Sequence, residues 1–176
     1  MSKLSLYAGF FILLIQSFNL SAKEDLVLHF GYGSNLSEAY MKKYTPGLKY
    51  VMNAQLPNFE IQFRKYSTDM KGGISSIIPK PGGMIYGVLY TIPKKEIEAL
   101  DILEDVPLGI YRRDTFNVLG DDGKWHEADL YRVVTPKGPY KPAKKYLDLM
   151  IAGAKEHNLN ADWQHKLQKM RSELEE

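Results

Sequence analysis

The stretch from His29 to Leu36, His-Phe-Gly-Tyr-Gly-Ser-Asn-Leu, carries residue types that could bind an anion. It follows the apolar run Leu-Val-Leu, which predicts a buried strand, and it precedes a segment that predicts a short helix from Leu36 to Tyr44. Gly31 and Gly33 fall at this strand-to-helix turn, where a chain needs unusual φ values or a close approach to a ligand. Because several backbone N–H groups of such a turn point one way, the stretch predicts a site for a carboxylate or an oxyanion.

Three well-known motifs do not fit this stretch. A dinucleotide-binding fingerprint needs a third glycine where the chain has Leu36, and an acid about 20 residues later, where none is present. A P-loop needs a Gly-Lys-Ser/Thr ending. A nucleophile elbow needs glycines two positions either side of Ser34, where the chain has Tyr32 and Leu36. We therefore expect a loop that positions a ligand, with Ser34 or Asn35 capping the helix that follows.

A second stretch, around Glu104, offers a carboxylate suited to proton transfer. Pro93 opens a predicted helix, and Ile97, Leu100 and Glu104 share one side of it because they follow helical spacing. A carboxylate among apolar neighbours is more basic than usual, which suits a general base. On these residues alone, a solvated acid near a helix end remains the simpler interpretation.

The histidines do not predict a metal site. His126, Glu127 and Asp129 come closest to one, but neighbours on a strand alternate between opposite faces. Zinc needs three or four ligands that converge. The chain also has no cysteine, which excludes disulfides, thiolate catalysis and cysteine-ligated metals.

Composition and pattern together predict one globular α+β domain. The 176 residues, of which 44% are hydrophobic and 25% charged, suffice for one core but are few for two. The formal charge is only +2, with bases and acids interspersed, so no nucleic-acid partner is expected. About six strands, with helices between and after them but no alternating β-α-β pattern, favour a closed or strongly curved sheet.

Periodicity and turn residues place the expected elements along the chain. Strands are expected at 49–56, 59–66, 74–78, 84–92, 110–119 and 125–135, with turns at Pro57-Asn58 and at Gly120 to Gly123. Helices are expected to begin at Pro93, to span 143–157, and to run through Trp163, Leu167, Met170 and Leu174.

Residues 1–22 predict an export signal. Lys3 precedes an apolar run from Leu4 to Leu14, and Ala22 offers a cleavage site. The run is shorter than the roughly 20 residues of a spanning helix. We therefore expect residues 23–176 to form the mature domain, exported to a periplasm or secreted, with no stable membrane span. An uncleaved segment would instead anchor the protein to a membrane.

Three motifs in order along the chain resemble the γ-glutamylcyclotransferase family. They are the loop from Phe30 to Leu36, the series Leu100-Asp101-x-x-Glu104-x-Val106-x-x-Gly109-x-Tyr111, and Tyr146 ahead of Gly153-Ala154-Lys155-Glu156-His157-Asn158-Leu159. The strand Gly87-Val88-Leu89-Tyr90 is similar as well. The resemblance extends from about Leu26 to Leu159.

The resemblance implies a small mixed β-barrel flanked by helices, with a C-terminal helical segment. It further implies an enzyme without metal or organic cofactor that cyclises a small γ-glutamyl amine or dipeptide, releasing 5-oxoproline and a free amine or amino acid. The roles it implies are Glu104 as catalytic acid/base, His29, Phe30, Gly31, Tyr32, Gly33 and Ser34 as the substrate-holding loop, Tyr146 as a substrate contact, and Tyr111 near the site. Asp105 departs from the glycine that often follows this glutamate, and adds a second negative charge.

Two other classes of function remain open on the sequence. The chain could be a non-catalytic binder of γ-glutamyl or other small molecules that kept the pocket, which turnover of a γ-glutamyl amine would decide. It could also be a membrane-tethered interaction domain, which the fate of residues 1–22 would decide.

The predicted leader can be tested directly. Because the apolar run is short and Ala22 follows it, signal peptidase should remove residues 1–22. Intact-mass measurement of the exported protein should then find Lys23, or a close neighbour, at the N-terminus. Met1 retained on a membrane-bound protein would contradict the prediction.

Overall fold

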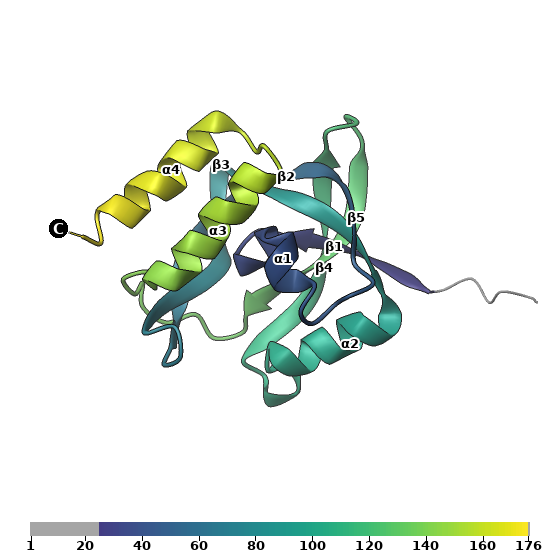
Figure 1. Ribbon diagram of the computed structural model, residues 1–176, viewed down its shortest axis with the longest axis horizontal. Coiled ribbons are helices and arrows are strands. Elements are labelled where there is room, and N and C mark those ends of the chain that lie inside the picture. Colours follow the sequence, from purple (N-terminus) through teal and green to yellow (C-terminus); the bar gives the residue numbers. More distant parts are fainter. Residues whose placement is uncertain (1–24, 176) are drawn as a thin grey trace, which may run out of the picture.

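The computed structural model describes residues 25–175, so the predicted leader lies outside the described part of the chain. In chain order the elements are β1 (Leu26–Gly31), the 3-10 turn η1 (Ser34–Leu36), α1 (Glu38–Met41), β2 (Lys49–Ser67), β3 (Gly72–Pro93), α2 (Lys94–Leu103), the 3-10 turn η2 (Val106–Leu108), β4 (Tyr111–Gly120), β5 (Trp125–Val133), α3 (Lys144–Glu156) and α4 (Ala161–Ser172). Figure 1 shows α1 and α3 side by side in front of the barrel, α4 beyond α3, and α2 below. No helix between residues 25 and 175 is long and apolar enough to cross a membrane.

The five strands close into a barrel in the order β1-β3-β2-β4-β5. Strand β1 pairs antiparallel with β3, and it meets β5 in parallel at His29 and Asp129, which closes the barrel. The mixed α+β barrel expected from the family resemblance is therefore confirmed. Its inside is filled by fully buried side chains such as Phe30, Leu56 and Leu130.

The predicted turn at Pro57-Asn58 is wrong, because β2 continues through these residues with only a local irregularity. Pro57 pairs with Met84 and Phe59 pairs with Pro79, so residues 80–83 of β3 bulge out opposite Asn58. Asn58 has a positive φ of 64°, and its side chain accepts a hydrogen bond from the backbone nitrogen of Gly82 (3.1 Å). Proline and asparagine suit an irregular strand position as well as a turn, so the four strands expected here are two long bent ones.

The first helix is also shorter than expected. The helices that begin after Pro93 and at about Ala143 are confirmed, and the last one is confirmed except that it ends at Ser172, before Leu174. Ser37 takes an extended conformation and its hydroxyl accepts from the backbone nitrogen of Tyr40 (3.3 Å). Ser37 is thus the N-cap of α1, in place of Ser34 or Asn35. The segment expected from Leu36 to Tyr44 becomes a single 3-10 turn followed by one turn of α-helix.

Helix α3 lies unusually close to the loop after β1. A Cβ atom on Gly153 would lie 2.3 Å from the carbonyl carbon of Leu36 and 2.5 Å from its oxygen. Leu147, Met150 and Ala154 bury the same helix against the core. A side chain at position 153 would therefore push the helix away from the loop, because backbone atoms cannot move aside as a flexible side chain can.

Substituting Gly153 by alanine should destabilise the fold. Overpacking costs about 1–3 kcal/mol and outweighs the roughly 1 kcal/mol that alanine gains in a helix. We expect a net loss of up to about 2 kcal/mol in the free energy of unfolding, measured by urea denaturation. The exposed Lys155→Ala on the same helix should change it by less than about 0.5 kcal/mol, and a stabilised Gly153→Ala would contradict this account.

Candidate active site

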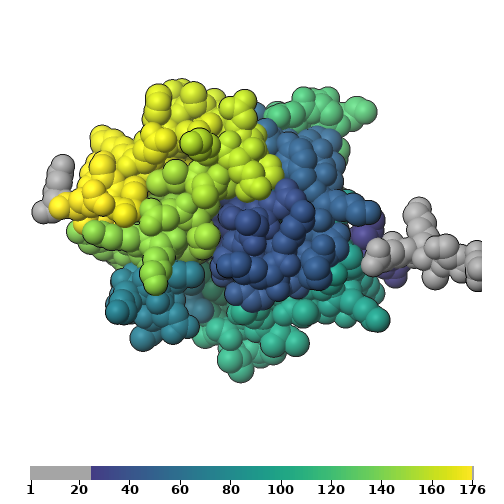
Figure 2. Space-filling model, viewed as in Figure 1, coloured from purple at the N-terminus to yellow at the C-terminus, as the bar shows by residue number. Residues whose placement is uncertain are grey.

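A cavity of about 350 Å³ opens where four segments meet. They are the loop after β1 with α1, the tip of the β2–β3 hairpin, the end of α2, and the start of α3. Tyr111 of β4 and Tyr131 of β5 complete the lining. Figure 2 shows these segments adjoining on one face of the molecule. The volume is that of a small-molecule site, and the walls carry carboxylates, hydroxyls and backbone groups.

Glu104 presents a carboxyl group of unusual basicity to this cavity. The residue caps the C-terminal end of α2, where its backbone nitrogen donates to the carbonyl of Leu100 (2.9 Å). Burial raises the pKa of Glu104 from its ordinary 4.5 to about 7, the nearby cation of Lys65 opposes this rise, and the anion of Asp105 adds to it. A carboxyl with this pKa can both accept and donate a proton near neutrality.

Asp101, one helical turn before Glu104, holds α2 against the barrel. Its two carboxylate oxygens accept from Nε and Nη2 of Arg113 (2.8 and 3.0 Å), a bidentate pair. Oδ1 also accepts from the hydroxyl of Tyr131 (2.7 Å), and Arg113 pairs in addition with Asp129. The Leu-Asp-x-x-Glu motif thus combines an anchor, Asp101, with the carboxyl that the anchor positions.

The loop and α3 meet at Gly33 and Tyr146. A Cβ on Gly33 would lie 2.3 Å from the hydroxyl oxygen of Tyr146 and 2.7 Å from Oγ of Ser75. The Tyr146 hydroxyl and Ser75 Oγ are hydrogen-bonded (2.8 Å), and the Tyr111 hydroxyl donates to the carbonyl of Ser75 (3.3 Å). The glycine is therefore required by the close approach of Tyr146, and its φ of −98° is not in the left-handed region.

The tyrosines of the cavity remain protonated. Burial raises the pKa of Tyr32, Tyr111 and Tyr146 above the usual value, and the hydrogen bonds of Tyr146 to Ser75 and Ser34 only partly oppose this. Neutral phenols add no negative charge. Because the hydroxyls of Tyr32 and Tyr111 already donate to backbone carbonyls, their oxygens can accept hydrogen bonds from a ligand, such as those of an ammonium group.

A buried histidine supports the loop from inside the barrel. The side-chain amide nitrogen of Asn35 lies 3.3 Å from Nε2 of His29, and an amide nitrogen can only donate, so this ring nitrogen accepts. Burial lowers the pKa of His29 from 6.5 to about 4, which keeps the ring neutral. Ser34 and Asn35 begin a 3-10 turn, so their backbone N–H groups have no partner within it.

The cavity brings together six of the nine residues predicted for the site: Tyr32, Gly33, Ser34, Glu104, Tyr111 and Tyr146. The other three do not line it. His29 and Phe30 are fully buried in β1, and a Cβ on Gly31 would lie 2.4 Å from the carbonyl oxygen of Asn35. These three support the loop from below, because the chain reaches the cavity only at Tyr32.

Further lining residues were not predicted from the sequence. They are Asn35, Tyr40, Tyr44, Lys65 and Ser75, among others. Asn35 belongs to the loop motif and could have been included. Lys65 and Ser75 come from β2 and β3, and nothing in their local sequence indicates that they face the same cavity as Glu104.

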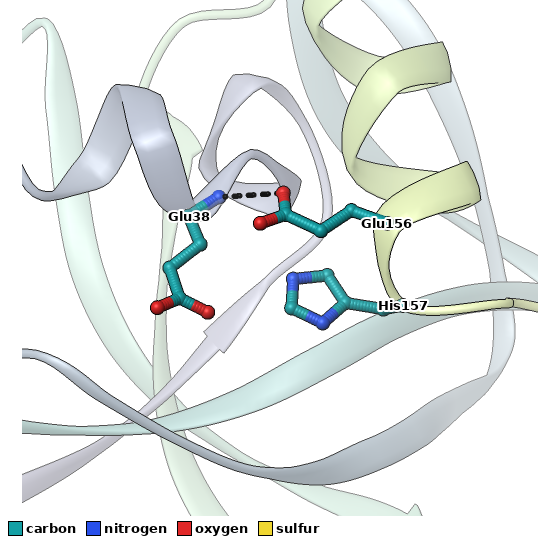
Figure 3. Close-up of side chains that lie close together, drawn as sticks. All are labelled: Glu38, Glu156 and His157. Carbon is teal, nitrogen blue, oxygen red and sulfur yellow. Dashed lines mark hydrogen bonds between the residues drawn. The ribbon is translucent and has the colours of Figure 1, made fainter.

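One group of possible metal ligands converges elsewhere in the described chain, with ligand atoms within 4.8 Å of one another: Glu38, Glu156 and His157 (Figure 3). Their polar atoms have other partners. Glu156 accepts from the backbone nitrogen of Glu38 (3.3 Å), Glu38 pairs with Lys42 (2.5 Å), and Nε2 of His157 is hydrogen-bonded to the Tyr90 hydroxyl (2.9 Å). The group fastens the end of α3 to the start of α1, beside the loop.

The cluster named from the sequence, His126 with Glu127 and Asp129, does not converge in the described chain. His126 pairs with Asp122 (3.0 Å), whereas Asp129 binds Arg113 and the hydroxyl of Thr115.

Comparison with known proteins gives consistent matches. Residues 84–167 match the AIG2-like family. The chain is 30% identical over 148 residues to the γ-glutamylcyclotransferase of Homo sapiens, covering 82% of this chain and 78% of that protein, and 30% identical over 147 residues to that of Mus musculus, covering 81% and 78%. A solved structure of a γ-glutamyl cyclotransferase superposes with a TM-score of 0.78 at 28% identity, covering 82% of this chain and 87% of that one.

The titration of Glu104 tests the electrostatics of the cavity. In the unliganded protein its carboxyl carbon, assigned in ¹³C NMR spectra by its loss in Glu104→Gln, should titrate near pH 7. Lys65→Met should raise this midpoint further, because it removes the cation that favours the carboxylate. Lys124→Met, which removes a charge outside the cavity lining, should leave it unchanged. A midpoint near 4.5 would contradict the assigned environment.

Proposed function

Because the chain belongs to the γ-glutamylcyclotransferase family, we propose that it cyclises γ-glutamyl amines or dipeptides to 5-oxoproline and releases the free amine or amino acid. The observation that carries this proposal is the carboxyl of Glu104, whose pKa is raised to about 7 in a cavity of about 350 Å³. A cavity of this size can enclose a dipeptide.

Glu104 is the proposed acid/base. The α-ammonium of the γ-glutamyl group loses a proton to its carboxylate, and the free amine then attacks the γ-carbonyl carbon of the same group. Glu104 then returns its proton to the leaving nitrogen, and the bond between this nitrogen and the former carbonyl carbon breaks as the tetrahedral intermediate collapses. The ring nitrogen gives up its remaining extra proton to the released amine, so the products are 5-oxoproline and an ammonium group. A pKa near 7 suits both steps, since the group must be a base first and an acid afterwards.

The remaining cavity residues are proposed to hold the reactive conformer. Closing a five-membered ring is intramolecular, so most of the barrier that an enzyme can remove lies in bringing amine and carbonyl together. Tyr32, Tyr111 and Tyr146 line the cavity as neutral phenols, which can fix the γ-glutamyl group by hydrogen bonds.

Backbone N–H groups of the loop are proposed to bind the negative oxygen atoms of the substrate. Gly33, Ser34 and Asn35 line the cavity, and the N–H groups of the last two have no partner within the 3-10 turn. They can donate hydrogen bonds to the α-carboxylate or to the oxygen of the tetrahedral intermediate. If residues 1–22 direct export as proposed, the γ-glutamyl substrate is one that is met outside the cytoplasm.

The proposal is tested by the product and by the loss of the base. Mass spectrometry of the purified protein with γ-glutamyl dipeptides, γ-glutamyl amines and glutathione should detect 5-oxoproline from at least one of them. Glu104→Gln keeps the shape and most hydrogen bonds but removes the base, so kcat should fall roughly 100- to 10,000-fold, while substrate binding persists.

Asp105→Asn is the matched control. Asp105 also lines the cavity, and its φ of 54° lies in the left-handed region, which asparagine tolerates well. This variant should keep most of the activity. Near wild-type turnover by Glu104→Gln together with an inactive Asp105→Asn would show that the acid/base has been assigned to the wrong residue.

A further inference from the structure

A second cavity, of about 460 Å³, adjoins the first along strand β2. It lies between β2, the start of β4 and the connector that leads from β5 to α3. Three basic residues line it, namely Arg64, Lys65 and Lys137, with the polar side chains of Thr135 and Tyr140. No acidic residue of the described chain contributes to its walls.

Arg64 is exceptional among the arginines of this protein. The chain has five, and the other four all form ion pairs with carboxylates: Arg112, Arg113, Arg132 and Arg171. Within residues 25–175, Arg64 has no such pair, and its Nε is buried without a hydrogen-bond partner. The guanidinium of Arg64, which lines the cavity, therefore has no carboxylate to balance its charge, and an anion seated in the cavity would provide one.

Lys65 connects this cavity with the proposed active site, because it lines both. Its Nζ lies 3.6 Å from a carboxylate oxygen of Asp105 and 5.1 Å from the ring centre of Tyr111. The two cavities therefore share a wall at Lys65.

The two cavities have opposite charge. Asp69, Glu104 and Asp105 line the active-site cavity with Lys65 as its one cation among the described residues. The second cavity has only cations, although the whole chain carries 23 basic and 21 acidic residues. Such a pair of cavities matches a substrate with an amine at one end and a negative charge at the other, because each wall attracts the opposite sign.

We propose that the cavity of Arg64, Lys65 and Lys137 binds the side-chain carboxylate of an acidic leaving amino acid. The favoured substrates are then γ-glutamyl peptides whose leaving amino acid carries a second carboxylate, and neutral or cationic γ-glutamyl amines are disfavoured. This inference rests on the proposed function and names the substrate class for the same reaction. Arg64 offers paired N–H donors that suit a carboxylate, and Lys137 adds an exposed cation.

Two nearly isosteric peptides test the inference. γ-Glutamyl-glutamate and γ-glutamyl-glutamine differ only in whether the second carboxylate is present. We expect the protein to favour the former by roughly tenfold in kcat/KM, mainly through KM, as one charge-assisted hydrogen bond would give. The ratio should fall to about one in Arg64→Gln and in Lys137→Gln. The second variant changes an exposed side chain, so it serves where loss of the partly buried Arg64 impairs folding.

Lys124→Gln is the control for net charge, because Lys124 lies in the turn between β4 and β5 and lines neither cavity. It should keep the tenfold ratio. A ratio near one in the wild type, or a ratio that survives both Arg64→Gln and Lys137→Gln, overturns the inference. So does activation of γ-glutamyl-glutamine turnover by free glutarate, which would mark a site for a separate effector.

Failure of this inference is distinguishable from failure of the proposed function. Equal release of 5-oxoproline from both peptides refutes the carboxylate site alone, whereas no release from any γ-glutamyl compound refutes the proposed reaction. Calorimetric binding of both peptides to Glu104→Gln makes the same comparison without turnover. Equal affinities there would also overturn the inference.

Discussion

The contact between helix α3 and the loop after β1 leaves no room for a side chain on either partner. Gly153 touches the backbone of Leu36, and Gly33 touches the hydroxyl of Tyr146. Because a Cβ atom at either position would overlap these atoms, the two glycines allow α3 to lie this close to the loop, which places Tyr146 in the lining of the cavity. Other elements hold α3 in this position. Strand β3 supplies Ser75 as the hydrogen-bond partner of Tyr146, and Trp163 and Leu167 of α4 are buried beside α3.

Burial shifts two titratable groups near this loop in opposite directions, and both shifts reduce stability. The pKa of Glu104 is raised from 4.5 to about 7, so the folded state loses stability relative to the unfolded state as the pH rises through that range. The pKa of His29 is lowered from 6.5 to about 4, so stability is lost there as the pH falls. A fold selected for stability alone would avoid both groups, which is consistent with a site kept for function.

Features carried by neighbouring residues could be predicted from the sequence, and features assembled from distant residues could not. The loop, the hairpin at Gly120 to Gly123 and the later helices are local patterns. The partners of Asp101, by contrast, lie 12 and 30 residues further on, and Ser75 meets Tyr146 across 71 residues. The bend at Asn58 was missed for another reason, since turns and irregular strand positions use the same residue types.

The bend at Asn58 divides the β2–β3 hairpin into two parts with different roles. Residues 49–57 and 84–91 belong to the barrel wall, whereas residues 59–67 and 72–79 pair with each other as an arm whose tip borders the cavity. Divergence of substrate choice can therefore proceed by changing the arm while the barrel stays constant. Side chains on a strand alternate between its two faces with a period of two. An insertion of two residues in each strand of the arm would therefore keep every side chain on its present face. An insertion of one residue would turn the side chains that now face the ligand to the opposite face.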